Sequence, residues 1–152
     1  MGPQRLALAA LLVGAATALA GCGQRSETSA DKGGAQQVEL VARSDLKFSV
    51  DTLSVKAGQP VALVLRNEDT AQLHDFTILK IPVKDVRGGN EAKGENVHAG
   101  MDMGMEPALH VSVQPGQTGR LEFTPTDRGQ YEFFCTVPGH KDAGMKGTLT
   151  VN

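Results

Sequence analysis

The strongest constraint on the fold is a series of about eight short β-prone runs between residues 37 and 152. Turn residues such as Gly58 and Pro115 end these runs, and no sustained 3.6-residue apolar repeat interrupts them. Short strands with glycine and proline turns predict an all-β domain, a β-sandwich or barrel. The expected strands are Val38–Ala42, Phe48–Val55 with a break near Asp51, Pro60–Arg66, His74–Lys80, Leu109–Val113, Gly119–Phe123, Gln130–Cys135 and Lys146–Val151.

The N-terminal 36 residues differ in character and are predicted to lie outside this domain. After Arg5, residues 6–20 form an uncharged apolar run of 15 residues, shorter than a membrane span of about 20 residues. Such a run is typical of a secretory signal peptide. Its end, Leu19-Ala20-Gly21-Cys22, resembles a bacterial lipobox, which implies cleavage before Cys22 and lipid on its sulfur. We therefore predict a signal peptide at 1–21, a lipidated Cys22 with a flexible tether at 22–36, and a membrane-anchored lipoprotein in the periplasm or on the outer cell surface. An ordinary secretory signal, with Cys22 as a bystander, is the alternative.

The cysteine count points to special chemistry at Cys135. The chain has two cysteines, Cys22 and Cys135, so lipid on Cys22 leaves Cys135 without a disulfide partner. A disulfide between the two is the alternative.

Net charge is close to balanced, with 15 Lys and Arg against 17 Asp and Glu, and no basic run argues for nucleic acid.

A mixed sulfur and nitrogen donor set lies on one short loop near the C-terminus. Cys135, His140 and Met145 follow one another at intervals of five residues, between two predicted strands. His74, at the start of an earlier strand, is placed to add a second imidazole. Two His and one Cys with a weak axial Met are the donors of a blue-copper electron-transfer site. Taken one at a time, each of these residues fits a structural role in a core or a turn, but the four together favour a copper site.

Strand alternation predicts which way these side chains point. Tyr131, Phe133 and Cys135 share one face of their strand, which carries no charge and is therefore expected to face inward. His74, Phe76 and Ile78 share the apolar face of theirs. Cys135 and His74 lie at opposite ends of these strands, so antiparallel pairing of the two strands brings them together. His110 alternates with inward residues and is expected to face solvent.

These residues resemble the cupredoxins, the small blue-copper proteins that include plastocyanin, azurin, auracyanin and rusticyanin. The resemblance covers most of residues 37–152 and is strongest at 115–151 and 73–77. The Cys-x4-His-x4-Met spacing is similar to that of auracyanin and rusticyanin. The resemblance implies a Greek-key β-sandwich and a monomer that holds one type 1 copper ion. It implies that the equatorial ligands are His74, Cys135 and His140 and that the axial ligand is Met145.

The resemblance also implies roles around the metal. Asp75 stands where azurin and plastocyanin commonly have an asparagine that ties the two ligand loops together. An ionised Asp75 accepts but does not donate, so its link to Thr136 is expected to run from hydroxyl to carboxylate. Val137, Pro138 and Ala143 are expected to form an apolar patch near a surface-proximal His140. Such a patch suits a small, transient interface with a redox partner protein.

A long polar insert at about 81–107 carries a second cluster of copper-type donors. His98, Met101, Met103 and Met105 lie within eight residues, and thioethers suit Cu(I). The alternative is a loop whose Met residues cover an apolar surface.

These observations leave two hypotheses: a one-electron carrier, and a copper-handling protein that stores or delivers the metal through the insert. An enzyme is not predicted, because a multicopper oxidase needs His-x-His pairs and none of the four His is so paired.

Overall fold

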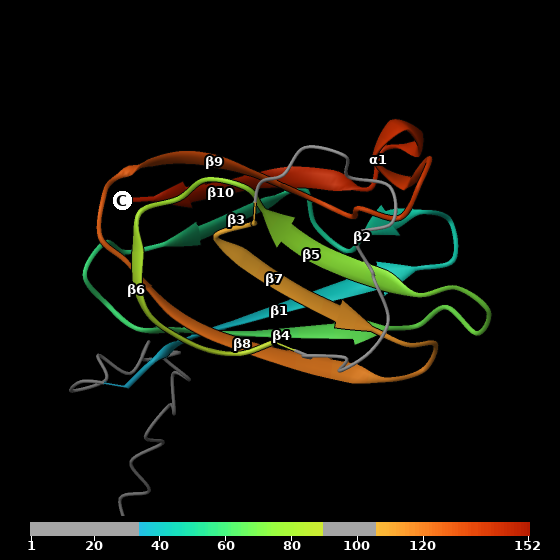
Figure 1. Ribbon diagram of the computed structural model, residues 1–152, viewed down its shortest axis with the longest axis horizontal. Helices are drawn as coiled ribbons and strands as arrows, with labels where there is room; N and C mark the ends of the chain where they lie inside the picture. The colour runs from blue at the N-terminus through green and yellow to red at the C-terminus, as the bar shows by residue number, and fades with distance from the viewer. Residues whose placement is uncertain (1–33, 90–105) are drawn as a thin grey trace, which may run out of the picture. The chain divides into compact units, whose positions relative to one another are not determined.

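The computed structural model describes residues 34–89 and 106–152, within the unit Asp31–Asn152 (Figure 1). Its strands form two five-stranded sheets that pack face to face as a β-sandwich. The first sheet has the order β2 (Lys47–Phe48), β1 (Gln36–Arg43), β4 (Val61–Asn67), β8 (Thr118–Pro125) and β6 (Val83–Gly88). The second has the order β3 (Thr52–Val55), β10 (Lys146–Val151), β9 (Gly129–Phe134), β5 (His74–Ile78) and β7 (Leu109–Val113). A single helical turn, α1 (His140–Ala143), interrupts the loop between β9 and β10.

The core lies between the sheets and is built from the inward residues of alternating strands. Leu63 and Leu65 of β4 and Leu121 and Phe123 of β8 are buried. Phe133 of β9 is fully buried, and its ring centroid lies 5.4 Å from that of Phe48 and 5.2 Å from that of Phe76. This aromatic cluster joins β2 of one sheet to β9 and β5 of the other. It therefore anchors the two strands that carry Cys135 and His74 at their ends.

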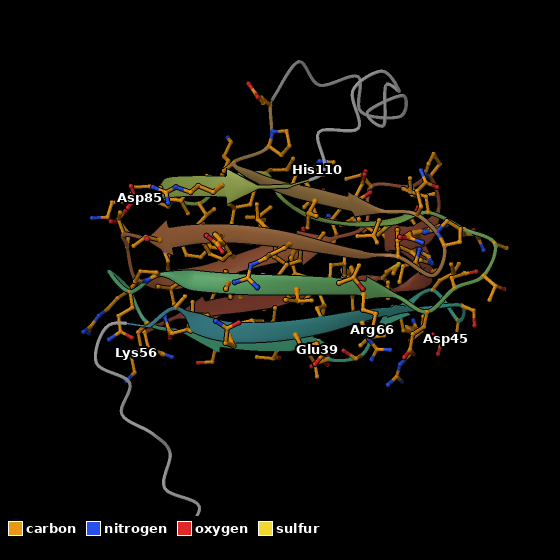
Figure 2. All side chains as sticks on the ribbon, turned by 90° about the horizontal axis from the view of Figure 1, so that it is seen from below. Glu39, Asp45, Lys56, Arg66, Asp85 and His110 are labelled. Carbon is orange, nitrogen blue, oxygen red and sulfur yellow. The ribbon has the colours of Figure 1, made fainter. Side chains whose placement is uncertain are left out.

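The outward face of the first sheet is charged, as alternation requires. Glu39 of β1 and Arg66 of β4 form a cross-strand ion pair, with 3.5 Å between Arg66 Nη2 and Glu39 Oε1 (Figure 2). Both side chains are exposed, so the pair contributes little to stability. Among the described residues, no helix is long and apolar enough to cross a membrane.

The predicted all-β sandwich is confirmed, with two differences in detail. The break predicted near Asp51 separates β2 from β3, and β6, inside the expected insert, is an additional strand, so the described residues form ten strands. β6 escaped prediction because it is an exposed, charged edge strand without apolar alternation, and its register against β8 shifts between Lys84 and Arg87. His110 is half-buried rather than fully exposed.

Candidate metal centre

The four side chains of the predicted site come from the start of β5 and from the segment between β9 and β10. His74 is the first residue of β5, and Cys135 directly follows β9. β5 and β9 are antiparallel neighbours with Thr77 opposite Phe134, which places the start of one beside the end of the other. His140 begins α1, and Met145 directly precedes β10.

Backbone hydrogen bonds close the loop from Cys135 to Met145 on itself. The Cys135 N–H donates to the Met145 carbonyl at 3.0 Å, and the Met145 N–H donates to the His140 carbonyl at 2.9 Å. Gly139 and Gly144 flank the helical turn with φ of 84° and 105°, a left-handed backbone that favours glycine. The three potential ligands of this loop are therefore held by a short, tightly bonded frame.

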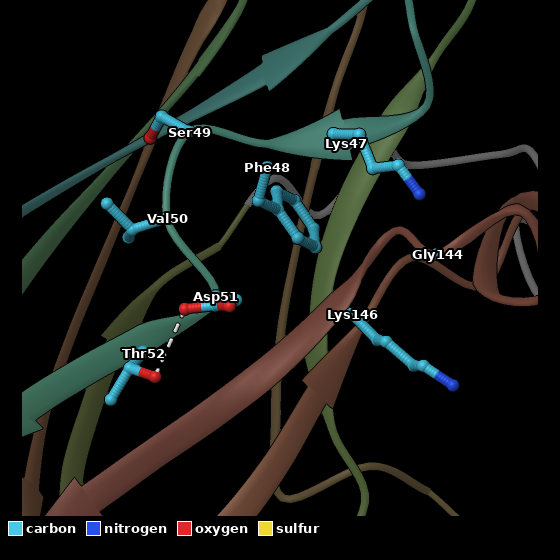
Figure 3. A pocket seen from close by; sticks show the side chains of 8 residues that line it. All are labelled: Lys47, Phe48, Ser49, Val50, Asp51, Thr52, Gly144 and Lys146. Carbon is cyan, nitrogen blue, oxygen red and sulfur yellow. Dashed lines mark hydrogen bonds between the residues drawn. The ribbon is translucent and has the colours of Figure 1, made fainter.

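Lys47 attaches this loop to the edge of the first sheet. Its Nζ donates a hydrogen bond to the Ala143 carbonyl. Figure 3 shows the Lys47 side chain extending from β2 toward Gly144, above a surface pocket beside the loop. A Cβ on Gly144 would lie 2.1 Å from Lys47 Nζ, so a glycine here leaves room for the lysine.

The donor atoms are spaced as ligands of one ion. Cys135 Sγ lies 3.5 Å from His140 Nδ1 and 4.0 Å from His74 Nδ1, and all three donors lie within 4.8 Å of one another. Metal bonds of about 2.0–2.3 Å place two donors on one ion roughly 3.5–4 Å apart. His74, Cys135 and Met145 are 0% exposed, and His140 is 4% exposed. The structure thus positions these residues as a copper site that excludes water.

The distal nitrogen of each imidazole, Nε2, lies within hydrogen-bond distance of a side-chain oxygen from the loop that precedes β5. His74 Nε2 lies 3.3 Å from Asp69 Oδ2, and His140 Nε2 lies 3.1 Å from Gln72 Oε1. Both partners offer an oxygen acceptor, which favours a proton on Nε2 of each ring, and Nδ1 of each ring is the nitrogen that faces the sulfur. Burial, and then the nearby His74, lower the pKa of His140, which favours the neutral form that a metal requires.

Asp75 ties the two ligand-bearing strands together. Its carboxylate accepts from the Thr136 hydroxyl at 2.7 Å and from the Thr136 N–H at 3.0 Å. It also accepts from the Thr77 hydroxyl at 2.9 Å. Asp75 is 1% exposed, so these bonds are shielded from water. The hydroxyl-to-carboxylate link expected at this position is therefore present, with two further donors.

The Cys135 thiol is held in its protonated form when no metal is present. Burial, and then the Asp75 carboxylate, raise the pKa of Cys135 to about 12. The Asp75 N–H donates toward Sγ at 3.5 Å and opposes this shift only in part. Because a metal binds the thiolate, metal binding must displace this proton.

This raised pKa predicts an alkaline loss of stability in the metal-free protein. Above about pH 9 the unfolded chain releases the thiol proton while the folded chain keeps it, so stability falls by about 1.4 kcal/mol per pH unit. We expect the free energy of unfolding in urea to fall by about 2 kcal/mol more in the wild type than in Cys135→Ala from about pH 8 to about pH 10.5. Equal pH dependence in both proteins would contradict the assignment.

Five predicted residues lie outside the part of the chain that the structure describes, and two residues beside the site were not predicted. Cys22, His98, Met101, Met103 and Met105 lie outside the described residues. Asp69 and Gln72 were not predicted, although both precede His74 closely. Their polar loop carries no periodic signal, and Gln72 reaches a residue 68 positions away along the chain.

Comparisons with known proteins agree with this geometry. Residues 35–152 match the family of copper binding proteins described as plastocyanin/azurin. The chain is 30% identical to the copper-resistant cuproprotein CopI of Pseudomonas aeruginosa, over 99% of each chain. It is 29% identical to auracyanin-A of Chloroflexus aurantiacus, over 97% of each. The structure of dithionite-reduced auracyanin from Roseiflexus castenholzii superimposes with a TM-score of 0.60 at 28% identity, covering 78% of this chain and 99% of that one. The chain therefore belongs to the plastocyanin/azurin family of copper-binding proteins, the cupredoxins.

Proposed function

We propose that this protein is a one-electron carrier with a single type 1 copper ion, working outside the cytoplasm. His74, Cys135 and His140 are the equatorial ligands in this proposal, and Met145 is the axial one. The observation that carries it is the convergence of two imidazole nitrogens and one thiol within 4.8 Å in a buried site. A soft S/N donor set of this kind suits copper and serves both of its oxidation states.

The protein's contribution to electron transfer is a site that keeps its shape. Bound copper would supply a one-electron couple between Cu(II) and Cu(I). Asp75 and Thr136 hold β5 to the ligand loop, and the backbone bonds from Cys135 and Met145 close that loop. Because the donors are fixed by packing and hydrogen bonds, little rearrangement accompanies a change in charge.

Titration with copper tests the proposal most directly. One Cu(II) ion per chain, an intense blue band and reversible bleaching by a reductant are the expected results. More than one tightly bound ion, or rapid exchange of Cu(I) with a competing chelator, favours the second candidate, a copper-handling protein. That candidate is motivated by the likeness to a copper-resistant cuproprotein and by the Met-rich segment that includes Met101 and Met103.

The surface around His140 is the proposed exit for the electron. Val137 is half-buried, and Pro138 and Ala143 are exposed beside the ligand loop. We name these three residues the docking patch. His140 is buried, and its N–H donates to the carbonyl of Val137 in the docking patch at 3.0 Å, so a redox partner on the docking patch would lie close to a ligand. A small apolar surface suits a partner that binds briefly.

A charge placed in the docking patch should slow electron exchange between copies of the protein. We expect Ala143→Glu to reduce the electron self-exchange rate about tenfold at low ionic strength, with partial recovery in salt, because like charges then meet at the interface. Line broadening in mixtures of the oxidised and reduced protein measures the rate. Val86→Glu, at a residue 45% exposed on edge strand β6, adds the same charge elsewhere. Equal slowing in both variants would remove the docking patch from the proposal.

We propose that the protein works outside the cytoplasm and is anchored to a membrane by a lipid on Cys22. The apolar run at 6–20 and the tetrad that ends at Cys22 support it. No enzymatic activity is proposed, because the site is buried and the four donors leave no open position for a substrate. Mass spectrometry of the mature N-terminus tests the anchor: an unmodified Cys22, or a chain that still carries residues 1–21, would exclude it.

A further inference from the structure

One loop holds the distal nitrogens of both proposed histidine ligands. This loop, residues 68–73, joins β4 to β5 and is here called the bracket loop. Its Asp69 accepts from His74 Nε2 at 3.3 Å, and its Gln72 accepts from His140 Nε2 at 3.1 Å. The two partners differ in kind. Asp69 is a carboxylate with 3% exposure, whereas Gln72 is a neutral amide at the surface. The two imidazoles are therefore in unequal electrostatic surroundings.

The Asp69 carboxylate is fixed in its orientation by the bracket loop. Oδ1 accepts from the N–H groups of Ala71 at 2.8 Å and Gln72 at 3.2 Å. With Oδ1 held in this way, Oδ2 points at His74. The Asp69 backbone is fixed too, because its N–H donates to Asn67 Oδ1 at 2.9 Å and its carbonyl accepts from Gly116 N–H at 3.1 Å.

Asn67 in turn attaches the bracket loop to the core. Its Nδ2 donates to the Gln72 carbonyl at 2.8 Å and to the Val113 carbonyl of β7 at 3.0 Å, and its side chain is buried. Every polar atom that positions Asp69 thus belongs to a connected network. The loop therefore fixes the Asp69 carboxylate so that one oxygen accepts from the loop backbone and the other faces His74.

We propose that Asp69 is a positioning residue for the copper site that also lowers its reduction potential. It holds His74 as the Nε2–H tautomer, so that Nδ1 is free for the metal. Its buried negative charge stabilises Cu(II) more than Cu(I), since attraction grows with the charge of the ion and is weakly screened in a dry interior. Gln72 gives His140 the same tautomer without the charge. This inference rests on the proposed copper site.

The test replaces Asp69 with asparagine, which has nearly the same shape. The two loop N–H groups keep the asparagine Oδ1 as their acceptor, so its NH2 group faces His74 Nε2 and offers a donor where an acceptor stood. In the metal-free variant we expect the ratio of Nε2–H to Nδ1–H forms of His74 to fall at least tenfold, as measured by ¹⁵N NMR of the imidazole. In the copper-loaded variant we expect the redox equilibrium to shift at least tenfold toward Cu(I), which is 59 mV for one electron.

Glu68→Gln is the matched control, because it removes the same charge from the bracket loop at a carboxylate that is 47% exposed and paired with Arg66. We expect it to change the redox equilibrium less than twofold and to leave the His74 tautomer unchanged.

Three results would overturn the inference. The first is a reduction potential of copper-loaded Asp69→Asn that is no higher than that of copper-loaded Glu68→Gln. If both variants are blue, this result leaves the proposed electron-carrier function in place. The second is a His74 tautomer that Asp69→Asn leaves as in the wild type. The third needs no variant: His74 found as Nδ1–H in the metal-free wild type removes the positioning role even where a variant does not fold. A wild-type protein that binds copper without a blue band would instead refute the proposed function.

Discussion

Cys135→Ala is expected to abolish the intense visible absorption of the copper-loaded protein. That absorption arises from charge transfer between a thiolate and Cu(II), and Cys135 is the one cysteine among the described residues. The two imidazoles and the Met145 thioether remain, so the variant still has a place for copper but no source for the band. Absorption and electron paramagnetic resonance spectra of wild type and variant, each with one equivalent of Cu(II), measure the effect.

The control for this experiment is the fold. The alanine variant should keep the wild-type strand signal in circular dichroism, because the removed sulfur lies at a strand end and the main-chain bond from the Cys135 N–H to Met145 is retained. A blue band that survives in the variant would show that another thiolate binds the metal. A wild-type protein that binds Cu(II) but stays colourless would exclude the carrier and favour copper handling.

Asp75→Ala is expected to be the most destabilising substitution near the site. The change removes the acceptor of the buried Thr77 hydroxyl and of the partly buried N–H and hydroxyl of Thr136. Unpaired buried donors cost about 1–3 kcal/mol each, and hydroxyl rotation recovers part of this, so we expect a loss of about 3–5 kcal/mol. Urea unfolding of the metal-free protein at neutral pH measures it.

Two further substitutions test whether this loss of stability comes from the missing hydrogen-bond acceptor. Asp75→Asn keeps an acceptor for Thr136 and should cost much less. It should also make copper binding less sensitive to acid, because the negative charge that helps to raise the pKa of Cys135 is gone. Asp45→Ala, at an exposed carboxylate, should stay within about 0.5 kcal/mol of the wild type. A loss in Asp75→Ala no larger than that in Asp45→Ala would show that the link contributes nothing.

The parts of the site that could be predicted are those encoded over short stretches of chain. Cys135, His140 and Met145 lie within eleven consecutive residues, and the types of their donor atoms already specify a soft metal. Alternation along β5 and β9 then indicated that His74 and Cys135 face inward, because the side-chain period of a strand is fixed by its backbone. The turn residues between strands gave the fold class for the same local reason.

β6 and the bracket loop could not be predicted in the same way. β6 has neither apolar alternation nor a buried face, so its strand conformation depends on the partner strand β8. Asp69 and Gln72 are ordinary polar loop residues in the sequence. Their contacts with His74 and His140 arise only when β5, β9 and the ligand loop meet.

The sequence by itself therefore determined the fold class, the metal type and the donors on the C-terminal loop, since these follow from side-chain chemistry and from the periodicity of a single strand. Only the tertiary structure decided which nitrogen of each imidazole faces the thiol, how strongly the thiol holds its proton, and which buried charge lies behind His74. Those properties depend on burial and on partners up to 68 residues apart in the chain, and no local pattern encodes such distances.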